Sequence, residues 1–170
     1  MTNSETFTVT TPSDREIVVT RVFNAPRKLV YEAWTNPKYL PLWMLGPEGW
    51  SMPVCETDLR LGGSWHIVWR HSNGQEMEMR GQYREVKPPE RVVSTESWGP
   101  EWPETLNTVV FTEQAGKTTA TITLLYPSKE HRDNALATGM KVGMAMSYDR
   151  LERLLLSPET SATAKDGKHS

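Results

Sequence analysis

Hydrophobic and polar residues alternate with a period of two along the middle of the chain, as they do in strands that bury one face. The alternating segments predict six strands, near residues 52–60, 63–71, 75–87, 90–98, 105–114 and 117–126. Short turn sequences separate them, and Asn73-Gly74 is the clearest because this pair favours a two-residue hairpin. Since short turns join antiparallel neighbours, the sequence predicts an antiparallel meander.

The region before the meander predicts one hairpin and two short helices. Two β-rich segments, 7–11 and 16–23, flank a turn that contains proline, serine and aspartate, which predicts a hairpin. Asn24 is expected to be the N-cap of a short helix, with Pro26 in the first turn, where its missing N–H costs nothing. A second short helix is expected around residues 39–43.

After the meander, the spacing of apolar residues becomes helical from about residue 128 to 156. The side that faces the core would contain Leu136, Met140, Met144, Ser147 and Leu151. A helix of this extent spans on the order of 40 Å, enough to cross a small domain. Gly139 and Gly143 lie inside it. They indicate either a close approach to the sheet, with Gly81 opposite, or a break between a lead-in helix and the main helix.

A long amphipathic helix needs an apolar partner, and the inner face of the meander is the only large one that the sequence offers. We therefore expect one α+β domain over residues 14–156, in which a curved antiparallel sheet wraps around the C-terminal helix. Residues 1–13 are expected to form an N-terminal extension with a hairpin strand. Residues 157–170 are small and polar, which predicts a disordered tail.

Alternation also assigns the residues that lie between sheet and helix. The expected inner surface, with its candidate ligand contacts, consists of Trp65, Ile67, Trp69, Met77, Met79, Tyr83, Trp98, Phe111, Met140 and Met144. Tryptophan and methionine fill cores, and they also line pockets that accept apolar molecules. Periodicity does not distinguish a filled core from a cavity, so both interpretations stay open.

One acidic residue, Glu96, shares a strand face with Trp98. A carboxylate buried beside tryptophan has a raised pKa and can act as a general acid or base. The alternative that we favour places Glu96 at the rim of the cavity, paired with an arginine such as Arg80 or Arg84. Glu96 and Arg80 are therefore candidate polar residues of the cavity or its rim, and no catalytic residue is assigned.

Composition narrows the function classes. The 170 residues carry a net charge of −2, which argues against nucleic acid as a partner because phosphate binding needs a basic surface. No long uncharged apolar run could span a membrane, and the N-terminus lacks a secretory signal, so we expect a cytoplasmic protein. Cys55 is the single cysteine, and the histidines are scattered. Nucleotide-binding, hydrolase and metal motifs are absent from the sequence, so no cofactor and no metal are expected.

Five segments together resemble one protein family: Ile17–Pro26, Leu29–Pro37, Asp58–Trp65, Met79–Val86 and Ser147–Glu152. In order and spacing they are similar to the family of activators of the heat-shock protein 90 ATPase. That family is a branch of the START-like, or Bet-v-one-like, helix-grip superfamily (SRPBCC). The resemblance covers residues 14–156 and implies a helix-grip fold, in which the curved sheet wraps around the C-terminal helix.

The resemblance implies three functions, in order of preference. START-like proteins bind lipids, sterols, hormones or polyketides beneath the long helix, which implies a small hydrophobic or amphipathic ligand. The namesake activators are co-chaperones, which implies a chaperone partner and a role in the stress response. Some relatives catalyse cyclisation in the cavity, which implies a cyclase or hydrolase, although no catalytic motif supports it here. A monomer or a homodimer is compatible with each function.

Overall fold

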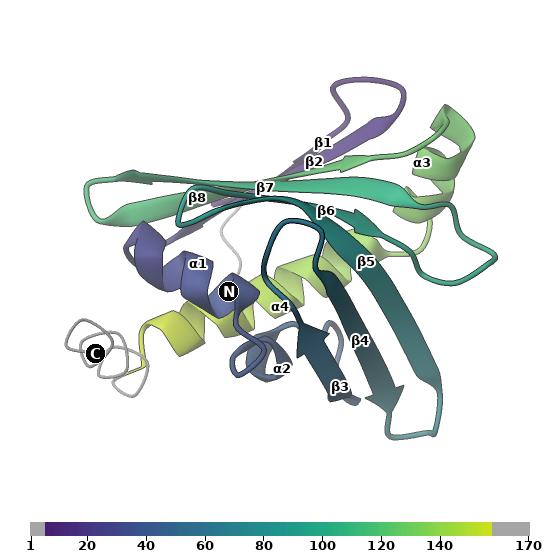
Figure 1. Cartoon of the computed structure of the whole chain (residues 1–170), viewed down its shortest axis with the longest axis horizontal. Helices are drawn as coiled ribbons and strands as arrows, with labels where there is room; N and C mark the ends of the chain where they lie inside the picture. Colours follow the sequence, from purple (N-terminus) through teal and green to yellow (C-terminus); the bar gives the residue numbers. More distant parts are fainter. Residues whose placement is uncertain (1–5, 158–170) are drawn as a thin grey trace.

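The computed structural model describes residues 6–157; residues 1–5 of the expected extension and residues 158–170 of the expected tail lie outside that range. A single eight-stranded antiparallel sheet curves around a helix (Figure 1). The strands are β1 (Phe7–Thr10), β2 (Glu16–Phe23), β3 (Trp50–Thr57), β4 (Ser64–His71), β5 (Glu76–Lys87), β6 (Arg91–Glu96), β7 (Thr105–Gln114) and β8 (Lys117–Leu125). Their order across the sheet is β1-β2-β8-β7-β6-β5-β4-β3, so the meander from β3 to β8 is confirmed.

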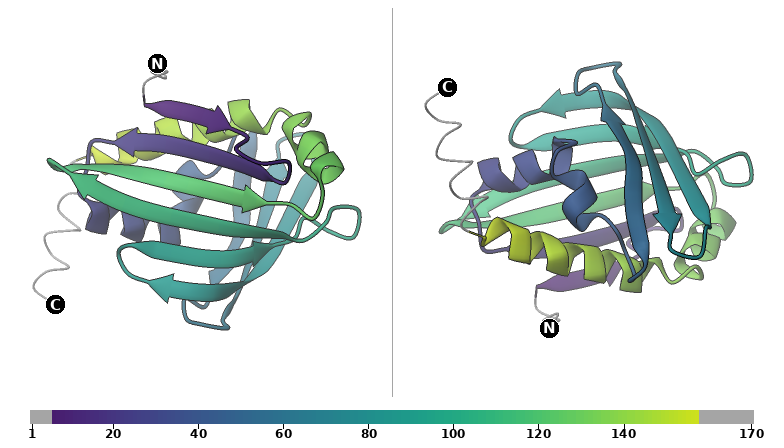
Figure 2. Two further views of the ribbon diagram at one scale, coloured as in Figure 1. Left: turned by 90° about the horizontal axis from the view of Figure 1, so that it is seen from above. Right: turned by 90° about the horizontal axis from the view of Figure 1, so that it is seen from below.

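The described helices are α1 (Arg27–Thr35), α2 (Leu40–Trp43), α3 (Lys129–Leu136) and α4 (Met140–Leu155). Helices α1, α2 and α4 lie on the concave side of the sheet, whereas α3 lies at one end (Figure 2). Strand β2 pairs with β8 along its whole length and so joins the N-terminal hairpin to the meander. The expected α+β architecture, a curved sheet wrapped around the C-terminal helix, is confirmed. No helix within residues 6–157 is long and apolar enough to cross a membrane.

Two strands end earlier than the alternation predicts. Strand β3 ends at Thr57 rather than at residue 60, because the chain turns through a hydrogen bond from the Gly63 amide to the Arg60 carbonyl. Strand β6 stops two residues before the predicted residue 98. Beyond it, only an isolated bridge joins Ser97 to Arg80. Past both ends the regular ladder gives way to single backbone contacts, the Asp58 amide with the Ser64 carbonyl and Ser97 with Arg80.

The C-terminal helical region is broken at Gly139, whose φ of 81° is left-handed and separates α3 from α4. The expected break is therefore confirmed, and one continuous helix is wrong. The alternative, an approach to Gly81, is also wrong, because Gly143 lies against Pro47, whose Cδ would be 3.6 Å from an added Cβ. Gly81 makes room for the ring of Trp65 instead, which an added Cβ would meet at 2.5 Å.

Helix α1 begins later than expected. Its N-cap is Pro26, so the prediction that Asn24 caps the helix is wrong. The backbone and side-chain amides of Asn24 donate to Glu152 of α4 instead, at 3.2 and 3.0 Å. Asn24 therefore connects the entry to α1 with the last turns of α4, two segments that are far apart in the sequence.

Aromatic rings fill the interior between α1, α2 and the second half of α4. Trp34 lies at the centre of this cluster, with its ring centroid 5.0 Å from Trp43 and 5.4 Å from Tyr148. Phe111 of β7 and Phe23 of β2 meet Trp34 edge-on, at 5.6 and 6.2 Å. Tilted and edge-to-face rings attract one another and bury a large apolar area. This end of the interior is therefore a filled core.

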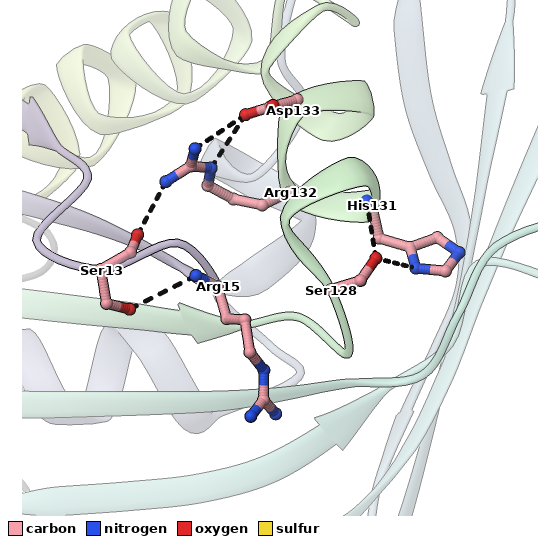
Figure 3. A network of polar contacts seen from close by, with 6 residues as sticks. All are labelled: Ser13, Arg15, Ser128, His131, Arg132 and Asp133. Atoms are coloured by element: carbon pink, nitrogen blue, oxygen red, sulfur yellow. Dashed lines mark hydrogen bonds and ion pairs between the residues drawn. The ribbon is translucent and has the colours of Figure 1, made fainter.

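Polar contacts connect α3 to the turn between β1 and β2 (Figure 3). The buried Arg132 of α3 donates to the Ser13 carbonyl at 2.7 Å and pairs with the adjacent Asp133 at 2.9 Å. Arg15, from the same turn, donates to the carbonyl of Tyr126 at 2.8 Å. These bonds hold the N-terminal hairpin and α3 together at the end of the sheet where β8 leads into α3.

Candidate functional site

The two halves of α4 have different surroundings. Its buried residues all lie from the middle of the helix onward, over the aromatic cluster: Ser147, Tyr148, Leu151 and Leu155. In the first half, Met140 and Met144 are only partly buried, although both pack against the core. The interior beneath the first half of α4 is therefore the part that the helix covers less tightly.

A stacked pair of tryptophans lies at this looser end. The rings of Trp69, on β4, and Trp98, just after β6, are 5.3 Å apart with an interplanar angle of 12°. The indole N–H of Trp69 donates to the Met44 carbonyl at 2.7 Å, in the loop between α2 and β3. The same loop is held on α4, because the Gly46 amide donates to the Ser147 hydroxyl at 2.8 Å. The loop thus joins the tryptophan pair to α4.

Glu96, the last residue of β6, places its carboxylate beside this pair. One carboxylate oxygen accepts a hydrogen bond from the Trp98 indole N–H and the other accepts one from the Asn107 side-chain amide, both at 2.8 Å. In the β6–β7 ladder Asn107 is opposite Ser94, so its side chain reaches Glu96 diagonally along one face. Glu96 is partly buried, and within residues 6–157 it has no ion-pair partner.

Burial raises the pKa of Glu96 above its usual value, and the hydrogen bonds from Asn107 and Trp98 offset part of that rise. The charge of Glu96 contributes to a raised pKa in two tyrosines. The pKa of Tyr126 is raised to about 12, first by burial and then by the charge of Glu96. The pKa of Tyr148 is raised by the same two causes in the same order. Both tyrosines therefore belong to the surroundings of Glu96.

Three buried side-chain polar atoms have no hydrogen-bond partner among residues 6–157. They are the carbonyl oxygen of the Asn107 side chain, the hydroxyl of Tyr31 on α1 and the Nε of Arg21 on β2. The pKa of Tyr83 is raised mainly by burial, with smaller contributions from Cys55 and Tyr31, so these groups lie near one another. Since buried polar groups are normally paired, these atoms are open to a partner that is not part of the described chain.

The site residues that the sequence predicts differ in how deeply they are buried. Six of them lie buried in the core: Trp65, Ile67, Trp69, Met79, Tyr83 and Phe111. Three others are partly buried and pack against that core: Trp98, Met140 and Met144. Within this set, Trp69 stacks on Trp98, and Trp98 donates a hydrogen bond to Glu96.

Two predicted residues lie elsewhere. Met77 is 38% exposed although its ladder partner Trp69 is buried, because this pair lies near the open hairpin end of β4 and β5. Arg80 is on the exposed face and pairs with Glu78 at 3.1 Å. The expected pairing of Arg80 with Glu96 is therefore wrong, and alternation explains why: Arg80 and the inward-facing Met79 are neighbours on one strand.

Asn107 and Tyr31 complete the polar surroundings, and neither is among the residues that the sequence predicts for the site. Asn107 has the same parity on β7 as Val109 and Phe111, which are buried. A polar residue at an apolar position of that strand was the available signal. Tyr31 lies on α1, where helical spacing indicates which face is buried. The same spacing does not indicate whether the hydroxyl of a buried tyrosine has a hydrogen-bond partner.

The remaining candidates for metal binding or reactivity within residues 6–157 have structural roles. No group of three or more His, Cys, Asp or Glu side chains there could hold a metal ion. Burial raises the pKa of Cys55 to about 11, so its thiol stays protonated and unreactive at neutral pH. The Nε2–H of His66 donates to the Glu78 carboxylate at 2.6 Å on the exposed face.

A depression of about 510 Å³ opens on the outer side of the sheet, at the ends of β6, β7 and β8. Its apolar floor includes Val93, Leu106 and Leu125, and two arginines, Arg15 and Arg84, line it. Leu106 is 37% exposed. Thr105 and Tyr126 also line this depression. Because Thr105 donates to the Glu96 carbonyl at 3.4 Å and the charge of Glu96 acts on Tyr126, the depression borders the surroundings of Glu96.

Comparisons with known proteins agree with the fold. The family model described as Activator of Hsp90 ATPase homolog 1-like protein matches residues 24–156. A crystal structure of a protein from Rhodobacter sphaeroides is 27% identical with a TM-score of 0.82, covering 88% of this chain and 97% of that chain. A protein from Chromobacterium violaceum is also 27% identical with a TM-score of 0.71, covering 82% of this chain and 96% of that chain.

A third similar structure is the AHSA1-like protein from Aeromonas hydrophila. It is 17% identical with a TM-score of 0.68, covering 83% of this chain and 96% of that chain, and this likeness shows the fold alone. Among curated proteins there is no significant match.

Proposed function

Because this chain belongs to the family of Activator of Hsp90 ATPase homolog 1-like proteins, with the START-like helix-grip fold, we propose that it binds a small apolar or amphipathic molecule between the sheet and α4. The observation that carries this proposal is the contrast between the two halves of α4. The second half covers a filled aromatic core, whereas the first half carries two partly buried methionines and lies against the loop whose Met44 carbonyl accepts a hydrogen bond from Trp69.

The proposed contacts combine apolar walls with one polar end. The apolar walls consist of Trp65, Ile67, Trp69, Met79, Tyr83, Trp98, Phe111, Met140 and Met144. Glu96 and the unpartnered oxygen of Asn107 form the polar end. Affinity would come mainly from apolar burial, at roughly 25 cal/mol per Å², while the polar end would fix the orientation of the ligand. Methionines on the covering helix suit this role because their side chains adapt to ligand shape.

The direct test is native mass spectrometry of the purified protein after incubation with a cell extract, compared with the same sample after denaturation. Binding predicts a discrete adduct mass that disappears on denaturation, and the mass identifies the compound class. A bare protein mass across extracts of different origin would contradict the proposal.

A second candidate is docking onto a chaperone of the heat-shock protein 90 type, in the cytoplasm and in the stress response. The outer depression favours this function, because the depression combines an exposed leucine, Leu106, with the exposed arginines Arg15 and Arg84. Exposed apolar area rimmed by charge is typical of protein–protein contacts. Binding of purified chaperone to the wild type, abolished by Leu106→Asp and retained by an exposed-loop control such as Leu61→Asp, would support it; no binding at low salt would contradict it.

A further inference from the structure

Glu96 is an acid whose environment provides no cation. Within residues 6–157 its carboxylate accepts only neutral donors, the indole of Trp98 and the amide of Asn107. A partly buried carboxylate is normally stabilised by an ion pair, because desolvation of the charge is expensive. The structure therefore holds a carboxylate in an apolar interior without the partner that such a group usually has.

The charged groups on the neighbouring elements do not supply that partner. Arg21 of β2, which is close to Tyr148, pairs through Nη1 with Asp149 of α4 at 2.8 Å, and its buried Nε has no hydrogen-bond partner among residues 6–157, so it does not bond to Glu96. Tyr126 at the end of β8 and Tyr148 on α4 face Glu96 as neutral phenols, because burial raises the pKa of both. On the outer side of the sheet, Arg15 donates to the carbonyl of Tyr126.

The same place also has a free acceptor. The side-chain oxygen of Asn107 is buried and has no donor within the described chain, although the amide of the same side chain is bonded to Glu96. An acceptor next to a carboxylate matches a group that carries several N–H donors. The stacked rings of Trp69 and Trp98 lie beside it, and aromatic faces also attract cations.

Building on the proposed function, we propose that the bound molecule is an amine, whose ammonium group donates to the Glu96 carboxylate and to the side-chain oxygen of Asn107. The apolar part of the amine extends along Trp98 towards Met140 and Met144. The chemical class is thus a primary or secondary amine that carries an aromatic or aliphatic body, rather than a neutral lipid or a carboxylic acid.

The test compares a series of phenylalkylamines with phenylalkyl alcohols of the same chain lengths, which differ only in the polar group. Binding is measured on the full chain by saturation-transfer NMR and tryptophan fluorescence. We expect the amines to bind about tenfold or more tightly than the matched alcohols. Glu96→Gln should remove this difference, and Glu101→Gln, which removes an exposed acid from the β6–β7 loop, should keep it.

Each result decides one question. Alcohols that bind as tightly as amines, or an amine preference that survives Glu96→Gln, would overturn the amine inference and leave the binding function standing. Failure of every amine to bind, in a protein that retains an adduct in native mass spectrometry, would overturn the amine inference alone, whereas absence of any adduct as well would overturn the binding function.

The wild type gives a second test that needs no variant. The amine preference should increase as the pH rises through the raised pKa of Glu96, because the carboxylate ionises while the amine stays protonated. A preference that does not change with pH would overturn the inference.

Discussion

The side-chain amide of Asn107 donates to the carboxylate of Glu96 at 2.8 Å, while the carbonyl oxygen of the same side chain has no partner among residues 6–157. Asn107→Leu removes a hydrogen bond to the carboxylate that lowers its pKa, so the pKa of Glu96 should rise further. A carbon-detected NMR titration of the Glu96 carboxyl in both proteins measures this shift. An unchanged or lower pKa in the variant would contradict the assigned contact.

The raised pKa of Glu96 also makes stability depend on pH. The folded state holds the Glu96 proton more tightly than the unfolded chain, in which glutamate has a pKa of about 4.3. The resulting stabilisation is fully present below that value and is lost as the pH rises through the folded-state pKa. Glu96→Gln removes this dependence, so the variant should gain stability relative to the wild type as the pH rises. Urea denaturation of both proteins at several pH values measures it; parallel pH profiles would contradict it.

Asp149 neutralises Arg21, whose side chain is only 6% exposed, through a contact of 2.8 Å. Asp149→Ala leaves the guanidinium buried and without its charge partner, which should cost roughly 3 to 5 kcal/mol of unfolding free energy. The double variant Arg21→Met, Asp149→Ala removes both charges and should recover much of that loss. A double variant as unstable as the single one would show that packing, rather than the uncompensated charge, causes the loss.

Two glycines should respond in opposite ways to alanine. An added Cβ on Gly81 would lie 2.0 Å from the Thr95 carbonyl oxygen, so Gly81→Ala must displace the backbone of β6 and should destabilise the protein by more than about 2 kcal/mol. On α4, an added Cβ on Gly143 would lie 3.6 Å from the Pro47 Cδ, an ordinary contact distance. Gly143→Ala should therefore increase the unfolding free energy by up to roughly 1 kcal/mol through helix propensity. Thermal unfolding of both variants measures the contrast, and equal effects would contradict it.

Sequence patterns predicted the sheet well because each half-buried strand carries its own period of two. The inward set around Trp65, Met79 and Phe111 is buried as alternation requires. Strand ends and the cap of α1 were missed, since they depend on hydrogen bonds such as that between Asn24 and Glu152, residues far apart in the sequence. A local pattern contains no information about such partners.

The candidate site was predictable in part. Alternation alone predicts that Glu96 and Trp98 share a strand face, and the two side chains are hydrogen-bonded in the structure. The partner of Glu96 could not be found in this way, because Asn107 reaches it from a different strand through the register of the β6–β7 ladder. The filled and loose halves of the interior also could not be separated, because both are lined by tryptophan.

Ligand binding under the first half of α4 is tested most directly by two tryptophan substitutions on that helix. Met144→Trp enlarges a partly buried side chain that faces the proposed site, whereas Val142→Trp enlarges one that is 62% exposed. Adduct retention, or the affinity for the identified ligand, is measured for both folded variants beside the wild type. We predict loss in Met144→Trp and wild-type binding in Val142→Trp. Undiminished binding in a folded Met144→Trp variant would contradict binding at this site.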